Sequence, residues 1–209
     1  MKIDKNFKGL VDEGWRYKIE GNIVSTENIE FDLDKGIFIT GSIEAGSSIG
    51  AGYSIEAGYS IKADSWIKAG GWIKAGGSIE AGSWIEADSW IKAGSWIEAG
   101  YSIEAGDSIK AGGSITAGDS IEAGSSIEAG GSIEAGSSIK AGDSFGISAG
   151  LYISCKGVLK FGLKVFAGVC TWKKISEAEK TITCGKIEGG VIECGILKER
   201  GLPATGKKQ

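Results

Sequence analysis

The side chains that could do chemistry in this 209-residue chain are carboxylates, lysines, tryptophans and four cysteines, because histidine is absent. Histidine is the residue best suited to proton transfer near neutral pH. Two carboxylates could act together instead, as in glycoside hydrolysis. Most acidic residues between positions 41 and 150, however, directly follow an isoleucine in a regular pattern, which is typical of solvated surface positions. We therefore expect a protein that is not an enzyme and that binds no cofactor.

The four cysteines all lie in the C-terminal third of the chain. Cys155, Cys184 and Cys194 each come two residues after an aliphatic residue. A zinc site built from the four thiolates is one interpretation, but no two cysteines are close in the sequence. Free cysteine also behaves as a small buried hydrophobic residue. The spacing favours packing over metal binding.

Tryptophan is concentrated in one short stretch. Five of the seven tryptophans directly precede an isoleucine there: Trp66, Trp72, Trp84, Trp90 and Trp96. From residue 102 to residue 144 the same position always holds serine. Large aromatic side chains confined to one region are typical of an interaction surface. The alternative is a set of stacked rings that only stiffens the fold.

A six-residue repeat must position these side chains. From Ile43 to Ile139 an isoleucine recurs every six residues, 17 times, and alanine always follows two residues later. Neighbouring side chains of a strand point to opposite sides, so isoleucine and alanine face inward together. The residues just before and just after isoleucine, which include the tryptophans, lysines and glutamates, then face outward. The repeat predicts a series of short, half-buried strands.

The residue after each alanine indicates a corner. It is glycine 15 times and aspartate twice, at Asp64 and Asp88. Glycine weakens a strand, and aspartate is among the few other residues that tolerate a left-handed backbone. We therefore expect a corner with positive φ at every sixth residue. Three strands make a triangular coil of about 18 residues, and such coils are stable only when stacked. The predicted fold is an all-β, single-stranded parallel β-helix.

Such a coil aligns outward residues in columns, one for each face. The residues that follow isoleucine on the first face are Glu44, Lys62, Glu80, Glu98, Thr116 and Glu134. Those on the second face are Gly50, Lys68, Glu86, Glu104, Glu122 and Lys140. Those on the third face are Glu56, Lys74, Lys92, Lys110 and Glu128. Three acids are adjacent on the second face and three bases on the third, and like charges at strand spacing repel. The two faces could neutralise each other in a homodimer; alternatively, the side chains extend into water.

The hexads resemble those of hexapeptide-repeat β-helix proteins. The resemblance covers roughly residues 41–150 and is carried by units such as Ile43-Glu44-Ala45-Gly46-Ser47-Ser48. It implies a β-solenoid. Many proteins of that group are acyltransferases with a histidine base and a long inserted loop, and residues 43–145 contain neither feature. The constant small residue here follows the aliphatic one by two positions, whereas in that family it usually precedes it.

The ends of the chain depart from the repeat. Residues 1–40 are predicted to cap the first coil, which five apolar residues are spaced to cover: Phe7, Leu10, Val11, Trp15 and Ile19. Residues 41–146 form the regular solenoid, and residues 147–209 form irregular coils and a strand-rich cap. The register shifts by two residues near Phe145, and residues 173–180 are expected to be a loop or one helical turn.

The C-terminal region loosely resembles repeat proteins of bacteriophages and mobile elements. The resemblance rests on Ile153-Ser154-Cys155-Lys156, on residues 165–172 and on Ile182-Thr183-Cys184-Gly185-Lys186. It implies a phage accessory protein that inhibits a host defence system such as CRISPR–Cas.

The functional prediction is a non-enzymatic protein that acts by surface contact. The predicted binding residues are the five tryptophans together with Lys74, Lys92, Lys110, Glu86, Glu104 and Glu122. The partner is expected to be a protein. The chain is also expected to form a homo-oligomer, with a dimer favoured. Single-stranded nucleic acid suits lysines beside aromatic rings, but the net charge of −4 disfavours it. A self-assembling structural protein is the alternative. The sequence has neither an apolar run long enough for a membrane span nor a hydrophobic signal core, so we expect a cytoplasmic protein.

Overall fold

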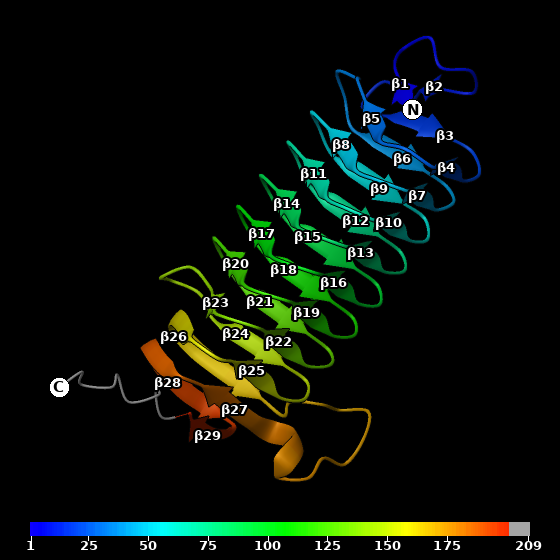
Figure 1. Ribbon diagram of the computed structural model, residues 1–209. Coiled ribbons are helices and arrows are strands. Elements are labelled where there is room, and N and C mark those ends of the chain that lie inside the picture. The colour runs from blue at the N-terminus through cyan, green and yellow to red at the C-terminus, as the bar shows by residue number, and fades with distance from the viewer. Residues whose placement is uncertain (201–209) are drawn as a thin grey trace, which may run out of the picture.

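The computed structural model describes residues 1–200, which form an all-β parallel solenoid of about ten turns (Figure 1). Nearly every strand of the repeat has three residues, and each pairs in parallel with the strand three positions later in the chain. One coil therefore contains three strands and about 18 residues. The fold class predicted from the hexads is confirmed.

Three columns of strands run along the solenoid, and we call them faces 1, 2 and 3. Face 1 contains β4 (Ile23–Ser25), β7 (Ile43–Ala45), β10 (Ile61–Ala63), β13 (Ile79–Ala81), β16 (Ile97–Ala99), β19 (Ile115–Ala117), β22 (Ile133–Ala135), β25 (Ile153–Cys155), β27 (Thr181–Cys184) and β29 (Ile196–Glu199). Face 2 contains β1 (Lys2–Ile3), β5 (Ile29–Phe31), β8 (Ile49–Ala51), β11 (Ile67–Ala69), β14 (Ile85–Ala87), β17 (Ile103–Ala105), β20 (Ile121–Ala123) and β23 (Ile139–Lys140). Face 3 contains β3 (Tyr17–Ile19), β6 (Ile37–Ile39), β9 (Ile55–Ala57), β12 (Ile73–Ala75), β15 (Ile91–Ala93), β18 (Ile109–Ala111), β21 (Ile127–Ala129) and β24 (Ile147–Ala149).

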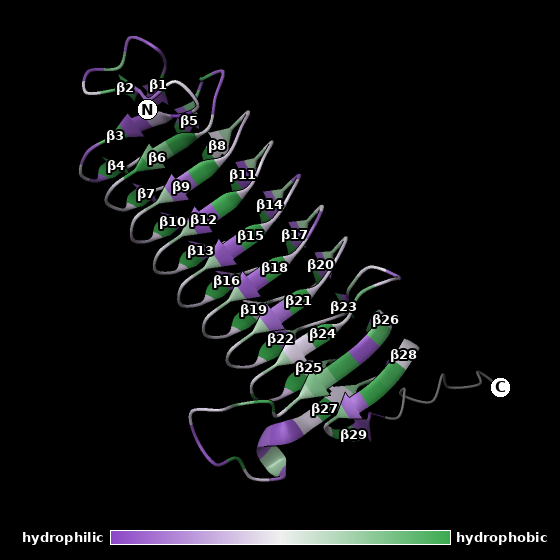
Figure 2. Cartoon of the chain, turned by 180° about the vertical axis from the view of Figure 1, so that it is seen from behind, coloured by the Kyte–Doolittle hydropathy of each residue, from purple (hydrophilic) through white to green (hydrophobic). Residues whose placement is uncertain are grey.

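The core is a stack of identical side chains. Ile61 lies over Ile79 and Ala63 over Ala81, and the same register holds from coil to coil. Each isoleucine of the repeat is 0% exposed, and burial of one such side chain contributes roughly 1.5–3 kcal/mol. Figure 2 shows the alternation on face 3, where a hydrophilic segment lies between hydrophobic ends in β15 and β18. The predicted inward positions of isoleucine and alanine are confirmed.

The predicted reason for the corner glycines is wrong. Within residues 1–200 positive φ occurs only at glycines outside the repeat slot, and at no other residue type. The constraint is steric: a Cβ atom on Gly118 would lie 2.0 Å from the carbonyl oxygen of Gly100, one coil earlier. The Gly118 N–H also donates a hydrogen bond to the Ala99 carbonyl at 3.0 Å. Close stacking of the corners, rather than backbone handedness, therefore selects glycine.

The N-terminal end contains longer coils of the same solenoid. Ile23 pairs with Ile43 and Tyr17 with Ile37, so each coil there is two residues longer than a coil of the repeat. The strand β2 (Val11–Asp12) pairs antiparallel with β3. Phe7 and Leu10 pack against the core and Ile19 is buried, as expected for a cap. The expectation that Val11 and Trp15 also cover the first coil is wrong, because they are 52% and 68% exposed.

At the C-terminal end the three-sided coil changes shape. Ile127 pairs with Ile147, which confirms the two-residue register shift. The long strand β26 (Val158–Ala167) then pairs with both β23 and β24, and thus spans faces 2 and 3 without a corner. The strand β28 (Lys186–Cys194) lies on β26. Between them, the 3₁₀ helix η1 (Ala178–Lys180) is the predicted helical turn and the sole helical segment among residues 1–200.

Candidate interaction surface

Four of the five predicted tryptophans form two stacked pairs. The rings of Trp66 and Trp84 on face 2 are 5.2 Å apart and inclined by 5°. Those of Trp72 and Trp90 on face 3 are 4.8 Å apart and inclined by 3°. Each pair joins adjacent coils, so stacking stabilises the solenoid by roughly 0.5–1.5 kcal/mol beyond area burial. All four side chains remain only partly buried, so the same rings also present apolar surface to solvent.

Gly50 lies next to the first ring of face 2 and to Glu30. It is the sole glycine in the outward position after isoleucine between Ile43 and Ile139. A Cβ atom there would lie 3.4 Å from the Trp66 ring and 2.7 Å from a carboxylate oxygen of Glu30. Sequence reasoning missed this contact, although the exception to the repeat was a visible signal.

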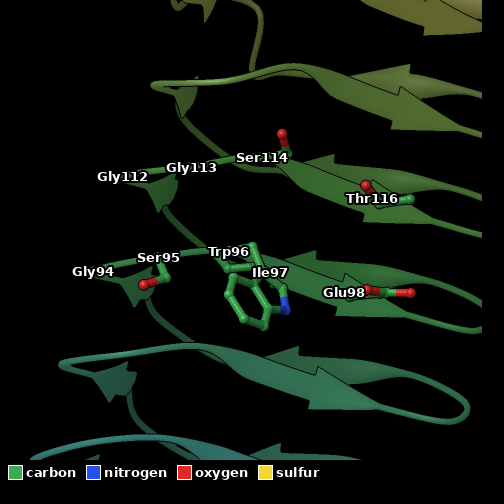
Figure 3. Close-up of a pocket in the computed structure, with 9 residues that line it drawn as sticks. All are labelled: Gly94, Ser95, Trp96, Ile97, Glu98, Gly112, Gly113, Ser114 and Thr116. Atoms are coloured by element: carbon green, nitrogen blue, oxygen red, sulfur yellow. The ribbon is translucent and has the colours of Figure 1, made fainter.

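Trp96 on face 1 is 47% exposed, and no other aromatic ring of residues 1–200 stacks on it. Ser114 occupies the equivalent position in the next coil, and a hollow of about 570 Å³ opens between the two coils. Figure 3 shows the indole extending away from Ser114, with Glu98 and Thr116 on adjacent strands beside it. The hollow combines an aromatic ring, a carboxylate and the three hydroxyl groups of Ser95, Ser114 and Thr116 on an open surface.

The predicted charge columns on faces 2 and 3 are confirmed by the strand pairing. Glu86 lies beside Glu104 and Lys74 beside Lys92, each in direct register. The end charges of each column find a partner in the next coil. These ion pairs are Lys68–Glu86 at 2.8 Å, Lys140–Glu122 at 3.2 Å, Lys74–Glu56 at 2.6 Å and Lys110–Glu128 at 2.6 Å. Within residues 1–200 the two central residues, Glu104 and Lys92, have no ion-pair partner.

Arg16 forms a clamp at the start of face 3 that sequence reasoning missed. Its guanidinium carbon lies 4.3 Å from the ring centres of both Trp15 and Phe38. A guanidinium nitrogen is 3.0 Å from Glu56, which also binds Lys74. Arg16 holds the outward position before a strand, as Trp72 does, and this shared position was the available signal. The clamp joins the N-terminal coils to the charge column of face 3.

Two of the cysteines belong to the core. Cys155 lies beside Ala135 in the strand register, and Cys155 and Cys184 are 1% and 0% exposed. Burial of these two thiols in the alanine slot is therefore confirmed, whereas Cys170 and Cys194 are partly exposed. No three metal-ligating side chains gather in the described part of the chain.

Alkylation should separate the two kinds of cysteine. Burial raises the pKa of the Cys155 thiol to about 12, from an ordinary value of 9.0, so its reactive thiolate fraction is about a thousandfold smaller. We expect iodoacetamide to modify Cys170 and Cys194 in the folded protein and Cys155 only after unfolding. Peptide mass spectrometry checks this, and modification of Cys155 as fast as Cys170 would contradict it.

Comparison with protein families gave no match, and comparisons with curated proteins and with solved structures gave none either. The class of this protein is defined by its own structure: it is a parallel β-solenoid with aromatic and charged residues on its exterior. Within residues 1–200 no helix is long and apolar enough to cross a membrane.

Proposed function

We propose that this protein is a non-catalytic β-solenoid that acts by surface contact with a protein partner. The observation that carries the proposal is the band of five tryptophans on three faces of adjacent coils. The repeat accepts serine at all equivalent positions from residue 102 to residue 138, so the fold does not require aromatic rings there. Partly exposed aromatic side chains beside charged columns are typical of the energetic centres of protein interfaces.

The proposal includes the absence of catalysis. It is supported by the lack of histidine and by the uninterrupted coils from Ile43 to Lys140, which contain no inserted loop to build a cleft. An acyl-transfer assay with a coenzyme A donor is the direct check, because many hexapeptide-repeat β-helix proteins, which the hexads resemble, are acyltransferases. Turnover above the uncatalysed rate would contradict the proposal.

The finer form of the proposal names the partner as a host defence complex, such as a CRISPR–Cas effector, in the host cytoplasm. Its support is the resemblance of residues 153–186 to repeat proteins of bacteriophages. An interference assay with and without the expressed protein tests this form separately, because failure to inhibit would leave the surface-contact function standing.

The tryptophan pair of face 3 provides the test of surface contact. Replacing Trp72 and Trp90 by serine gives these coils the residue that later coils carry, so the fold should be retained. We expect capture of the partner from host lysate to fall by about tenfold or more. Trp172→Ser is the matched control, since Trp172 is 64% exposed but lies outside the band. Equal capture by both variants, with circular dichroism unchanged, would disprove the proposed role of the band.

A further inference from the structure

Faces 2 and 3 carry charge columns of opposite sign over five successive coils. The column on face 2 reads Lys68, Glu86, Glu104, Glu122 and Lys140. The column on face 3 reads Glu56, Lys74, Lys92, Lys110 and Glu128. Each column is symmetric about its centre. Every charge of one column is therefore opposite in sign to the charge that it faces in the other, whichever ends are aligned. Both columns belong to one rod but point outward from different faces, so their full complementarity is available only between two copies.

The isolated chain neutralises these columns incompletely. The outer residues of each column form ion pairs with their neighbours, at 2.6 to 3.2 Å. The central residue is left between two residues of its own sign: Lys92 between Lys74 and Lys110, and Glu104 between Glu86 and Glu122. Like charges at strand spacing destabilise each other. A surface that brought Glu104 of one copy to Lys92 of another would offset both repulsions.

The direction of packing follows from the order of residues on each strand. All strands of the repeat run in the same sense around the solenoid, so every face shows the residue before isoleucine on one side and the residue after it on the other. When two such faces meet with antiparallel solenoid axes, charge column faces charge column and aromatic column faces aromatic column. Parallel axes would place tryptophans opposite charges. The charge match therefore selects the antiparallel arrangement.

The aromatic columns fit the same arrangement. Once Glu104 faces Lys92 of an antiparallel copy, counting coils outward sets every other pair. Trp84 then faces Ser108 of the second copy, and Trp66 faces Ser126. Ser102 and Ser120 face Trp90 and Trp72 of the second copy in the same way. Each large ring thus meets a serine, which is the size complementarity that two packed surfaces need. The charge register and the ring register are independent features of the sequence, and they agree.

We propose that face 2 of one copy docks on face 3 of a second, antiparallel copy of this chain, with Glu104 against Lys92 at the centre. This rests on the proposed function, since it names a second copy as one partner of the same surface. Docking of face 2 on face 2 would oppose Glu104 to Glu104, and docking of face 3 on face 3 would oppose Lys92 to Lys92. The contact is therefore heterologous, and the second copy keeps a free face 2 for a third.

The assembly is a ribbon of rods that alternate in direction. One contact covers five coils, about 19 Å along the axis at strand spacing, by strands about 10 Å long. This footprint is well below the roughly 800 Å² that each partner contributes to a stable complex. Each contact is thus weak, and assembly depends on concentration and is screened by salt. Face 1 remains free, so each copy displays its Trp96 hollow to other partners.

Charge exchange between copies tests the proposal. Lys92→Glu places two glutamates at the centre of the contact, and Glu104→Lys places two lysines there. We expect each variant alone to associate about tenfold more weakly than the unchanged protein in concentration-dependent light scattering. In an equimolar mixture, face 2 of the Lys92→Glu variant keeps Glu104 and face 3 of the Glu104→Lys variant keeps Lys92. These two faces make the original contact, and the two altered faces make the reversed one, so association should return to the original level. Glu98→Lys on face 1 makes the same charge change as Glu104→Lys and should leave association unaltered.

Ser102→Trp tests the register, because it sets a ring against Trp90 of the second copy, and it should abolish association. Ser114→Trp on face 1 is its control. An unchanged protein that stays monomeric at millimolar concentration, or a mixture that fails to recover, would overturn the proposal. Partner capture is measured on the same samples. Monomers that still capture a partner through Trp72 and Trp90 would overturn only the docking between copies. Normal capture by the Trp72/Trp90 variant would instead overturn the proposed function.

Discussion

Replacing Ile91 by alanine is expected to lower the free energy of unfolding by about 2–5 kcal/mol. Ile91 is 0% exposed and lies in register between Ile73 and Ile109 of the adjacent coils. Removal of its side chain leaves a cavity that isoleucines fixed in the coils on both sides cannot fill. Because each coil contacts only its neighbours, the loss weakens two coil interfaces at the middle of the rod.

Urea denaturation followed by tryptophan fluorescence measures this loss where it occurs, since five tryptophans lie between residues 66 and 96. Ile91→Val is the matched control and should cost only about 0.5–1.5 kcal/mol, because the β-branched shape is kept. A loss below about 1 kcal/mol for Ile91→Ala, well under the usual range, would mean that the stack of isoleucines is not the main source of stability. It would also weaken the case for the close packing from which the outer columns take their register.

Most of the solenoid could be predicted from the sequence, because its period is a direct consequence of spacing. Once isoleucine and alanine are assigned to one side of a strand, a coil of three hexads fixes which outward residues are neighbours. The neighbouring positions of Lys74 and Lys92 in the charge column, and of Trp72 and Trp90 in the stacked pair, could therefore both be predicted from the sequence. Such arithmetic fails where the period breaks, as in the longer coils near Tyr17 and in the long strand β26.

Contacts between different periods could not be predicted. Arg16 reaches Trp15, Phe38 and Glu56 because the N-terminal coils bring residues that are distant in the sequence onto one face. No spacing rule covers that irregular stretch. Within residues 1–200, Lys92 and Glu104 likewise have no ion-pair partner because their neighbours in each column pair with the residues at the column ends. A column of residues can be read from a sequence, but the pairing within it depends on side-chain geometry.

For the corner glycines, the position of the corner was predicted correctly but the reason for glycine was wrong. The sequence indicates a corner but not which atoms approach each other there. The aspartates at two of these corners suggest a left-handed backbone only when contacts with the preceding coil are not considered. Asp88 has no positive φ, and its N–H donates to the Ala69 carbonyl at 3.2 Å. The Asp64 N–H donates to the Ala45 carbonyl at 3.1 Å, as the Gly76 N–H does to the Ala57 carbonyl. Both aspartate corners thus keep the hydrogen bond of the glycine corners without a left-handed backbone, so positive φ is not what the slot requires.

Gly118→Ala is accordingly expected to destabilise the protein by about 1–3 kcal/mol, the usual cost of forcing an extra carbon into a packed site. The new Cβ would approach the Gly100 carbonyl oxygen to 2.0 Å unless the two coils separate. Such separation would lengthen the hydrogen bond from the Gly118 N–H to the Ala99 carbonyl. Thermal unfolding followed by circular dichroism measures the effect.

Gly52→Ala is the matched control, because Gly52 occupies the same slot of the repeat but no atom lies within 4 Å of the position that a Cβ would take there. That variant should be neutral or more stable by about 0.4–1 kcal/mol, since alanine reduces the freedom of the unfolded chain. Gly118→Asn separates the two explanations for the slot. A left-handed corner would tolerate asparagine better than alanine, whereas a steric corner penalises both, because both bring the same Cβ atom to the Gly100 carbonyl. Full stability of Gly118→Asn would restore the backbone explanation, and equal losses for the two substitutions would establish that coil-to-coil contact selects glycine.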